Sequence, residues 1–124
     1  MLSSGRVVAF APSSNLDESV AFYRDKLGLE LAHRDGFAAV FTSGNDTVRV
    51  ALVGPFEPQR GTVVGWEVDD VRATAGWLAS RGVPLERFEG MGQDELGIWN
   101  PPGGGAVGWF KDPGGNTLSI SGHA

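Results

Sequence analysis

The feature of this sequence that most constrains its fold is an internal repeat. A strand pattern, a helix pattern and three further strand patterns occur in the first half, and the second half repeats that order. The apolar positions of the two helix patterns correspond at one constant offset: Leu16, Val20 and Tyr23 are matched by Val71, Ala75 and Leu78. Repetition of a supersecondary unit predicts two similar modules that share a core. We therefore expect a single domain over residues 1–124, with a first module at about 5–54, a linker at 55–60 and a second module at about 61–122.

Residues that favour helix ends flank both predicted helices. Asn15 and Asp70 are residue types that favour the N-cap position, and Gly28 and Gly82 stand where a glycine ends a helix. Runs of apolar and β-branched residues between turn residues predict the strands. The expected strands are Val7–Ala11, Leu29–His33, Phe37–Thr42, Thr47–Val53, Thr62–Val68, Val83–Phe88, Ala106–Lys111 and Thr117–Ser121. A short extra strand, Glu95–Trp99, is expected within the glycine- and proline-rich stretch that follows Phe88.

Composition excludes several classes of function. Ten basic and fifteen acidic residues give a net charge of −5, which opposes binding to nucleic-acid phosphates. The chain has no cysteine, so disulfides, thiolate metal sites and cysteine nucleophiles are impossible. No apolar stretch is long enough to span a bilayer, and no secretory signal pattern is present. We therefore expect a cytoplasmic protein without a nucleic-acid or membrane partner.

Three stretches resemble one known family. The residues from Ser19 to Leu29, SVAFYRDKLGL, are similar to its first-helix motif, and those from Trp66 to Val71, WEVDDV, are similar to the opening of its second module. The residues from Phe110 to Asn116, FKDPGGN, resemble its "F-x-D-P-D-G-N" signature, with Gly114 in place of aspartate. Together they identify the chain as a member of the vicinal oxygen chelate superfamily, which includes glyoxalase I, extradiol dioxygenases and bleomycin resistance proteins.

The resemblance implies an α+β fold of two tandem βαβββ modules. Their eight strands would form a curved, mostly antiparallel sheet, an open cup with the helices outside. The resemblance also implies a small-molecule ligand in the cup and pairing as a homodimer. It places the four metal-ligand positions of metal-dependent relatives at Val8, Arg49, Val63 and Ser119. Because these side chains do not offer the imidazole or carboxylate donors that divalent metals need, we expect no metal and no other cofactor.

A relocated metal site is an alternative that the sequence leaves open. It would use His33 together with Glu30, Glu67 or Asp94, whereas the second histidine, His123, lies in the C-terminal tail. Glu67 and Asp94 are also the two weak candidates for metal-free acid–base catalysis. The pattern of Asp94 and its neighbour Glu95 favours a solvated turn over acid–base catalysis.

Aromatic and polar side chains on the expected strands are candidates for ligand contact. The candidate ligand-binding residues are Arg49, Glu67, Trp99, Phe41, Trp109 and Ser119. If Arg49 points into the cup, it requires a carboxylate partner, either Glu67 or one on a ligand, because a buried unpaired guanidinium is costly. Trp99 belongs to the inserted segment and could act as part of a lid.

The sequence thus supports three functional hypotheses. The leading one is a metal-independent protein that binds a planar or amphipathic small molecule in the cup. The alternative is a lyase, isomerase or dioxygenase-like enzyme that uses a relocated metal site or metal-free acid–base chemistry. The third is a structural or interaction role in which the cup is filled by side chains.

Overall fold

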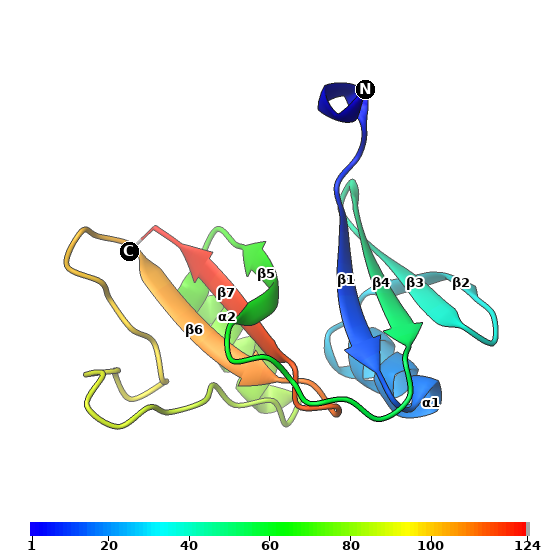
Figure 1. Ribbon diagram of the computed structural model, residues 1–124. Coiled ribbons are helices and arrows are strands. Elements are labelled where there is room, and N and C mark those ends of the chain that lie inside the picture. Colours follow the sequence, from blue (N-terminus) through cyan, green and yellow to red (C-terminus); the bar gives the residue numbers. More distant parts are fainter. Residues whose placement is uncertain (124) are drawn as a thin grey trace.

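The computed structural model describes residues 1–123 and contains two sheets and two main helices (Figure 1). The first half forms β1 (Val8–Ser13), α1 (Leu16–Val20), its continuation η2 (Ala21–Lys26), β2 (Glu30–Arg34), β3 (Ala38–Ser43) and β4 (Asp46–Leu52). The second half forms β5 (Thr62–Glu67), α2 (Val71–Ser80), β6 (Ala106–Lys111) and β7 (Thr117–Gly122). A short 3₁₀ turn, η1 (Leu2–Ser4), precedes β1 and projects away from the sheets.

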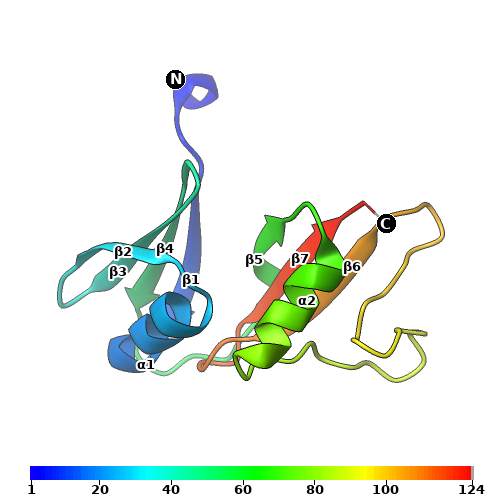
Figure 2. The same cartoon turned by 180° about the vertical axis from the view of Figure 1, so that it is seen from behind.

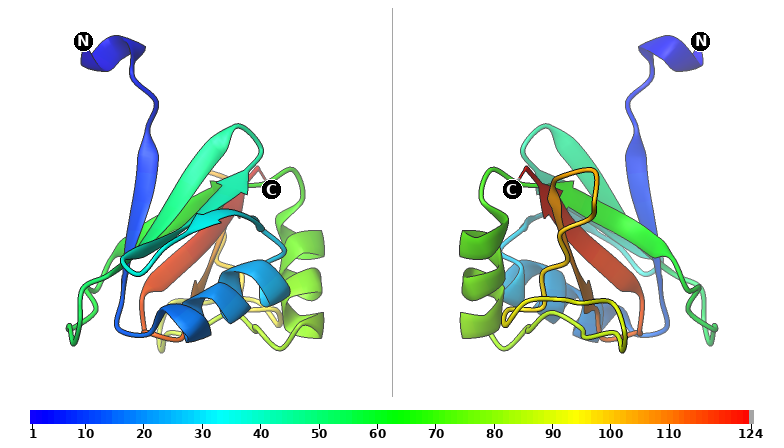
Figure 3. Two further views of the ribbon diagram at one scale, coloured as in Figure 1. Left: turned by 90° about the vertical axis from the view of Figure 1, so that its right-hand side faces the viewer. Right: turned by 90° about the vertical axis from the view of Figure 1, so that its left-hand side faces the viewer.

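The two sheets have corresponding topologies. Their strand orders are β1-β4-β3-β2 and β5-β7-β6. In each sheet the first strand pairs in parallel with the last strand of its half, and the other pairings are antiparallel. Both helices lie on one side of the sheets (Figure 2), and a side view places α2 and the linker at 55–60 on opposite sides (Figure 3). The α+β repeat expected from the sequence is therefore present.

The expected eight-stranded sheet is not formed, because the sheets have four and three strands. Residues 83–88 occupy the position next to β6, but Pro84 has no N–H to donate, and the segment contributes the Glu86 N–H bond to the Trp109 carbonyl. The Gln93 side chain replaces further strand pairing: it accepts from the Phe88 N–H at 2.6 Å and donates to the Glu86 carbonyl at 2.9 Å.

The second expected strand that is absent is Glu95–Trp99. Only Trp99 pairs, through an isolated antiparallel bridge to Val107. The backbone bonds of this bridge run in both directions, at 2.8 and 2.9 Å. Gly97 adopts a φ of +93° just before the bridge, a conformation that interrupts a regular strand. The inserted segment is therefore an irregular loop that is tied to β6 at one point.

Capping residues define the helix starts as the sequence predicts. Asn15 accepts from the Glu18 N–H at 3.1 Å, and Asp70 accepts from the Ala73 N–H at 2.9 Å. The first helix then widens from an α-helix into a π-helix over Ala21–Lys26. The adjacent residues Phe22 and Tyr23 of this segment are both buried in the core.

One hydrophobic core extends through both modules, and a buried polar cluster joins them. The Tyr23 hydroxyl donates to Asp112 at 2.7 Å, and the Asn116 side-chain amide donates to Asp112 and to the Pro12 carbonyl, each at 2.8 Å. Burial and the neighbouring Asp112 carboxylate raise the pKa of Tyr23 far above its usual range, so Tyr23 acts as a neutral donor. The cluster connects η2 and β1 of the first module to the β6–β7 turn of the second.

Candidate functional site

Each sheet has a face without a covering helix, which we call its open face. On the three-stranded sheet, the alternation of side chains along β6 places Val107, Trp109 and Lys111 on the open face, because Gly108 and Phe110 are buried. The register aligns Trp109 with Ser119 and Gly65 across the three strands, and it aligns Val107 with Ser121 and Glu67. Small residues therefore form the centre of this face: a Cβ added to Gly65 would lie 2.6 Å from the Ser119 hydroxyl oxygen.

Three aromatic side chains stand at one edge of this small-residue region. The Trp99 and Trp109 rings are stacked with centroids 6.1 Å apart, and Phe88 packs edge-on against Trp109 at 5.7 Å. We call Phe88, Trp99 and Trp109 the aromatic cluster. Phe88 is 41% exposed, and the two tryptophans are half-buried, so the cluster keeps apolar surface open to solvent. A flat apolar molecule can stack on such surface.

The open face of the four-stranded sheet has a different character. Its central row contains Phe10, Arg49, Val40 and His33, which are aligned across β1, β4, β3 and β2. The Arg49 guanidinium lies 5.6 Å from the centroid of the Phe10 ring, a cation–π contact. Both side chains are exposed. This face is therefore partly apolar and carries a cation at its centre.

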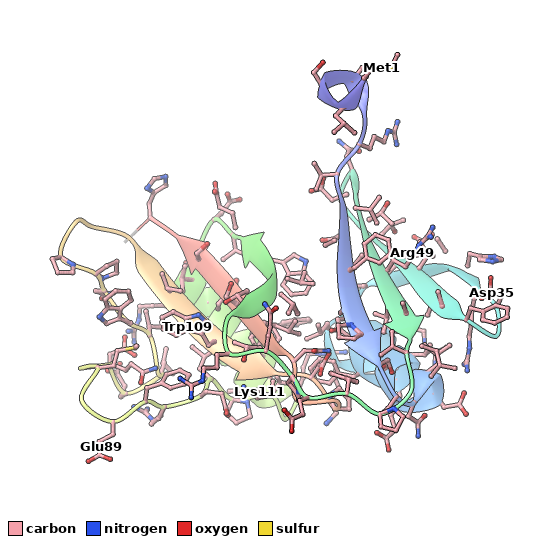
Figure 4. All side chains as sticks on the ribbon, in the orientation of Figure 1. Met1, Asp35, Arg49, Glu89, Trp109 and Lys111 are labelled. Carbon is pink, nitrogen blue, oxygen red and sulfur yellow. The ribbon has the colours of Figure 1, made fainter. Side chains whose placement is uncertain are left out.

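The candidate ligand-binding residues are divided among three places. Glu67, Trp99, Trp109 and Ser119 belong to the three-stranded sheet or the loop bridged to it, and Arg49 belongs to the four-stranded sheet (Figure 4). No ion pair joins Arg49 to Glu67 within residues 1–123. Phe41 is fully buried and packs against Tyr23 at 5.6 Å between ring centroids. Phe41 therefore faces the core rather than an open face.

Sequence reasoning missed Gly65 and Ser121, which complete the small-residue region beside the aromatic cluster. Residues two positions apart on a strand lie on the same face. Gly65 lies two positions before Glu67 and Ser121 lies two positions after Ser119, so both could have been placed on the same face as these candidates from the sequence. Because of the bulge between Thr62 and Val64, Gly65, rather than Val64, is the residue aligned with Ser119.

The four positions of the usual metal ligands do not offer a donor set for a divalent metal. They contain two apolar side chains, one guanidinium and one hydroxyl, at Val8, Val63, Arg49 and Ser119. Nowhere in residues 1–123 do three histidine, aspartate or glutamate side chains gather closely enough to hold a metal ion. His33 instead lies 3.6 Å from Asp35, with both side chains exposed. These residues do not fit the metal centre of metal-dependent relatives.

Asp94 organises the inserted loop. One of its carboxylate oxygens accepts from the N–H groups of Leu96 and Ile98, both at 2.9 Å, and the other accepts from Arg72 at 3.0 Å. Partial burial raises the pKa of Asp94, but these hydrogen bonds and the Arg72 charge outweigh that effect and lower the pKa overall. Arg72 also pairs with Glu95 at 2.7 Å. These contacts define a loop-stabilising role for Asp94.

Replacing Asp94 with alanine is expected to loosen this loop without unfolding the domain. Two backbone N–H groups lose their acceptor, so hydrogen exchange at Leu96 and Ile98 should accelerate about tenfold, which corresponds to about 1.4 kcal/mol. The pKa of Asp94 is lower in the folded state than in the unfolded state. The stabilisation that the Asp94 carboxylate gives the loop is therefore fully present above the unfolded-state pKa of about 4, and it is lost as the pH falls through the folded-state pKa. In acid, the hydrogen-exchange protection of Leu96 and Ile98 in the wild-type protein should therefore approach that in the variant.

The control variant is Glu95→Gln, since Glu95 is 72% exposed. Equal acceleration of hydrogen exchange in this control would contradict the loop-stabilising role of Asp94.

The arrangement of two corresponding modules defines the class of protein, and sequence comparison defines the family. The family model of the glyoxalase/bleomycin resistance protein/dioxygenase superfamily matches residues 6–120. The chain belongs to this superfamily. No curated protein sequence matches the chain. Within residues 1–123, no helix is long and apolar enough to cross a membrane.

Solved structures with the same fold include proteins of different descriptions. A lactoylglutathione lyase from Agrobacterium tumefaciens has a TM-score of 0.71 at 20% identity, with 96% of this chain and 93% of that chain covered. A bleomycin resistance determinant encoded on the transposon Tn5 has a TM-score of 0.75 at 18% identity, with coverages of 97% and 98%. A glyoxalase/bleomycin resistance protein/dioxygenase from Alicyclobacillus acidocaldarius has a TM-score of 0.71 at 20% identity, with coverages of 97% and 92%. At these identities the similarity establishes the fold.

Proposed function

We propose that the protein binds a small planar or amphipathic molecule on the open face of the three-stranded sheet. The observation that carries this proposal is the exposed aromatic cluster beside the small-residue region of Gly65, Ser119 and Ser121. A ring stacked against Trp109 would lie beside the hydroxyl of Ser119, its neighbour in the register. Binding sites commonly combine apolar and aromatic surface with a few placed polar groups. Glu67, in the adjacent row, would favour a hydrogen-bond donor on that side of the ligand.

Binding in this proposal is independent of metal. The support is the chemistry of the four ligand positions, where two valines, an arginine and a serine stand in place of metal donors. Stacking and hydrogen bonding at the aromatic cluster require no Lewis acid. We therefore assign no metal or cofactor to the site, and we propose sequestration of the ligand rather than its chemical conversion.

We further propose that two copies of the chain pair as a homodimer in the cytoplasm. Support for pairing comes from the large apolar side chains exposed in the first module. They include Val7, Phe10, Phe37, Leu52 and Val53, each more than two-fifths exposed. Large apolar side chains exposed in this number favour an interaction surface. A second copy placed there would bring Arg49 into the interface or the ligand site.

Ligand screening by tryptophan fluorescence tests the proposed function. A panel of planar uncharged, anionic and cationic aromatic molecules should contain members that quench the emission saturably, because Trp99 and Trp109 belong to the aromatic cluster. The binding curve should be unchanged in excess EDTA and after dialysis against zinc, nickel, manganese or iron. Metal-dependent binding, or a stoichiometric metal ion retained after removal of loose ions, would overturn the metal-independent assignment. No quenching by any member of the panel would overturn the binding function.

A further inference from the structure

We propose that the protein has a second binding site, for one small uncharged apolar ring, on the helix side of the junction between the two modules. A cavity of about 150 Å³ lies there between the end of the first helix, α2 and the core face of the three-stranded sheet. Its lining includes Leu27, Trp66, Thr74, Trp77, Leu78 and Phe110. The proposal does not depend on the open-face function, since α2 and the open face lie on opposite sides of this sheet (Figure 2).

The size of the cavity selects the ligand. The volume of about 150 Å³ is similar to that of an apolar cavity that binds benzene, and most of the lining is aliphatic or aromatic. A water molecule requires two to four polar partners, whereas Ser43 and Thr74 supply the side-chain polar groups of this lining together with the Trp66 indole N–H. The donors of Trp66 and Thr74 are already engaged: the Trp66 N–H donates to Ser43 at 3.1 Å, and the Thr74 hydroxyl donates to the Asp70 carbonyl at 2.9 Å. The lining therefore offers a ligand mainly apolar contacts.

The charge of the ligand follows from the same lining. No ionisable side chain lines the cavity among the described residues, and the guanidinium at its rim, Arg81, already donates to two backbone carbonyls. A charged ligand inside the cavity would therefore lose its hydration without a free counter-charge in the lining. Trp66 stacks on Phe110 with ring centroids 6.3 Å apart. Trp66, the half-buried member of this pair, offers aromatic surface to a ligand ring. The expected ligand class is thus a neutral aromatic or alicyclic ring of about six to eight heavy atoms.

The rim of the cavity is held in place by Arg81. Its guanidinium lies 4.8 Å from the centroid of the Trp77 ring, and it donates to the Lys26 carbonyl at 2.6 Å and to the Asp25 carbonyl. These contacts connect α2 to the end of the first helix. Gly28, with a φ of +75°, lies next to the Trp77 ring, which an added Cβ would approach to 3.5 Å. A fixed rim keeps the cavity formed before a ligand arrives, which reduces the entropy lost on binding.

Toluene binding followed by the four tryptophan indole N–H signals in NMR tests this site. Trp66 and Trp77 line the cavity, whereas Trp99 and Trp109 belong to the aromatic cluster of the open face. Single tryptophan-to-phenylalanine variants assign the signals. Toluene should shift the Trp66 and Trp77 signals saturably and leave the Trp99 and Trp109 signals in place. Benzoate, a charged ring of similar size, should shift neither cavity signal.

A matched pair of variants at Thr74 distinguishes cavity binding from surface association. Thr74→Met extends the side chain into the cavity and should weaken toluene binding about tenfold or more. Thr74→Val has nearly the volume of threonine and should retain the affinity. Shifts confined to Trp99 and Trp109, absence of any shift, or equal affinity in both variants would each overturn the second site. None of these results tests whether a larger planar ligand binds the open face. The second site and the open-face site can therefore be disproved independently of each other.

Discussion

Asp112→Ala is expected to lower the free energy of unfolding by about 3–5 kcal/mol, because the substitution leaves several buried donors without an acceptor. Asp112 is 6% exposed and accepts from the fully buried Tyr23 hydroxyl and from the Asn116 side chain. Its other oxygen accepts from the N–H groups of Gly114 and Asn116 at 3.0 and 2.9 Å. Urea denaturation followed by circular dichroism measures the change as a lower transition midpoint.

Two further variants show whether the loss comes from this cluster. Tyr23→Phe removes one hydroxyl and keeps the Asn116 bond to Asp112, so it should cost about 1–2 kcal/mol. Glu57→Ala, which changes an exposed carboxylate in the linker, should alter stability by less than about 0.5 kcal/mol. A loss for Asp112→Ala that is no larger than that of Glu57→Ala would show that the cluster does not join the modules.

Trp109→Ala is expected to reduce the affinity for any ligand found in the fluorescence screen about 30-fold or more, which corresponds to about 2 kcal/mol. Trp109 occupies the middle of the aromatic cluster, where it stacks on Trp99 and supports Phe88. Its removal eliminates one stacking surface and both neighbouring ring contacts. Isothermal titration calorimetry measures the affinity without relying on the tryptophan that has been removed.

Trp77→Ala is the matched control for this substitution. Trp77 is 42% exposed but lies on α2, on the helix side of the module junction. Its removal should leave the affinity of the open face within about twofold. An equal loss in both variants would indicate a general effect on folding, and an affinity unchanged by Trp109→Ala would contradict the placement of the ligand.

The sequence predicted the features that depend on local patterns. The capping residues Asn15 and Asp70 and the positive-φ glycines Gly28 and Gly82 occupy their predicted positions. These features require only a few neighbouring residues, so a single sequence contains the necessary information. The repeated order of elements was predictable for the same reason. The apolar residues of each module follow strand and helix periodicities that can be recognised in that module alone.

Features that depend on tertiary context were not predictable in the same way. The segment 83–88 has a strand-like composition, but Pro84 and the side-chain bonds of Gln93 replace a regular ladder. Phe41 lies on a strand whose side chains alternate between two faces, and the pairing register decides which of these faces points to the core. In the structure the face that carries Phe41 packs against Tyr23. The π-helical turn that buries both Phe22 and Tyr23 has no periodic signature in the sequence. Of the residues of the proposed binding face, the sequence analysis named Trp99, Trp109 and Ser119 but missed Gly65 and Ser121.

The cluster that joins the modules also has a consequence for the order of events on the ribosome. Tyr23 and Pro12 emerge early, whereas Asp112 and Asn116, which bond to them, are separated from them by 89 and 104 positions. During synthesis the first module must wait for the last strands before its buried hydroxyl and carbonyl acquire partners. Domains generally fold as units during translation. We therefore expect the nascent chain to resist protease only after nearly the whole sequence has left the exit tunnel.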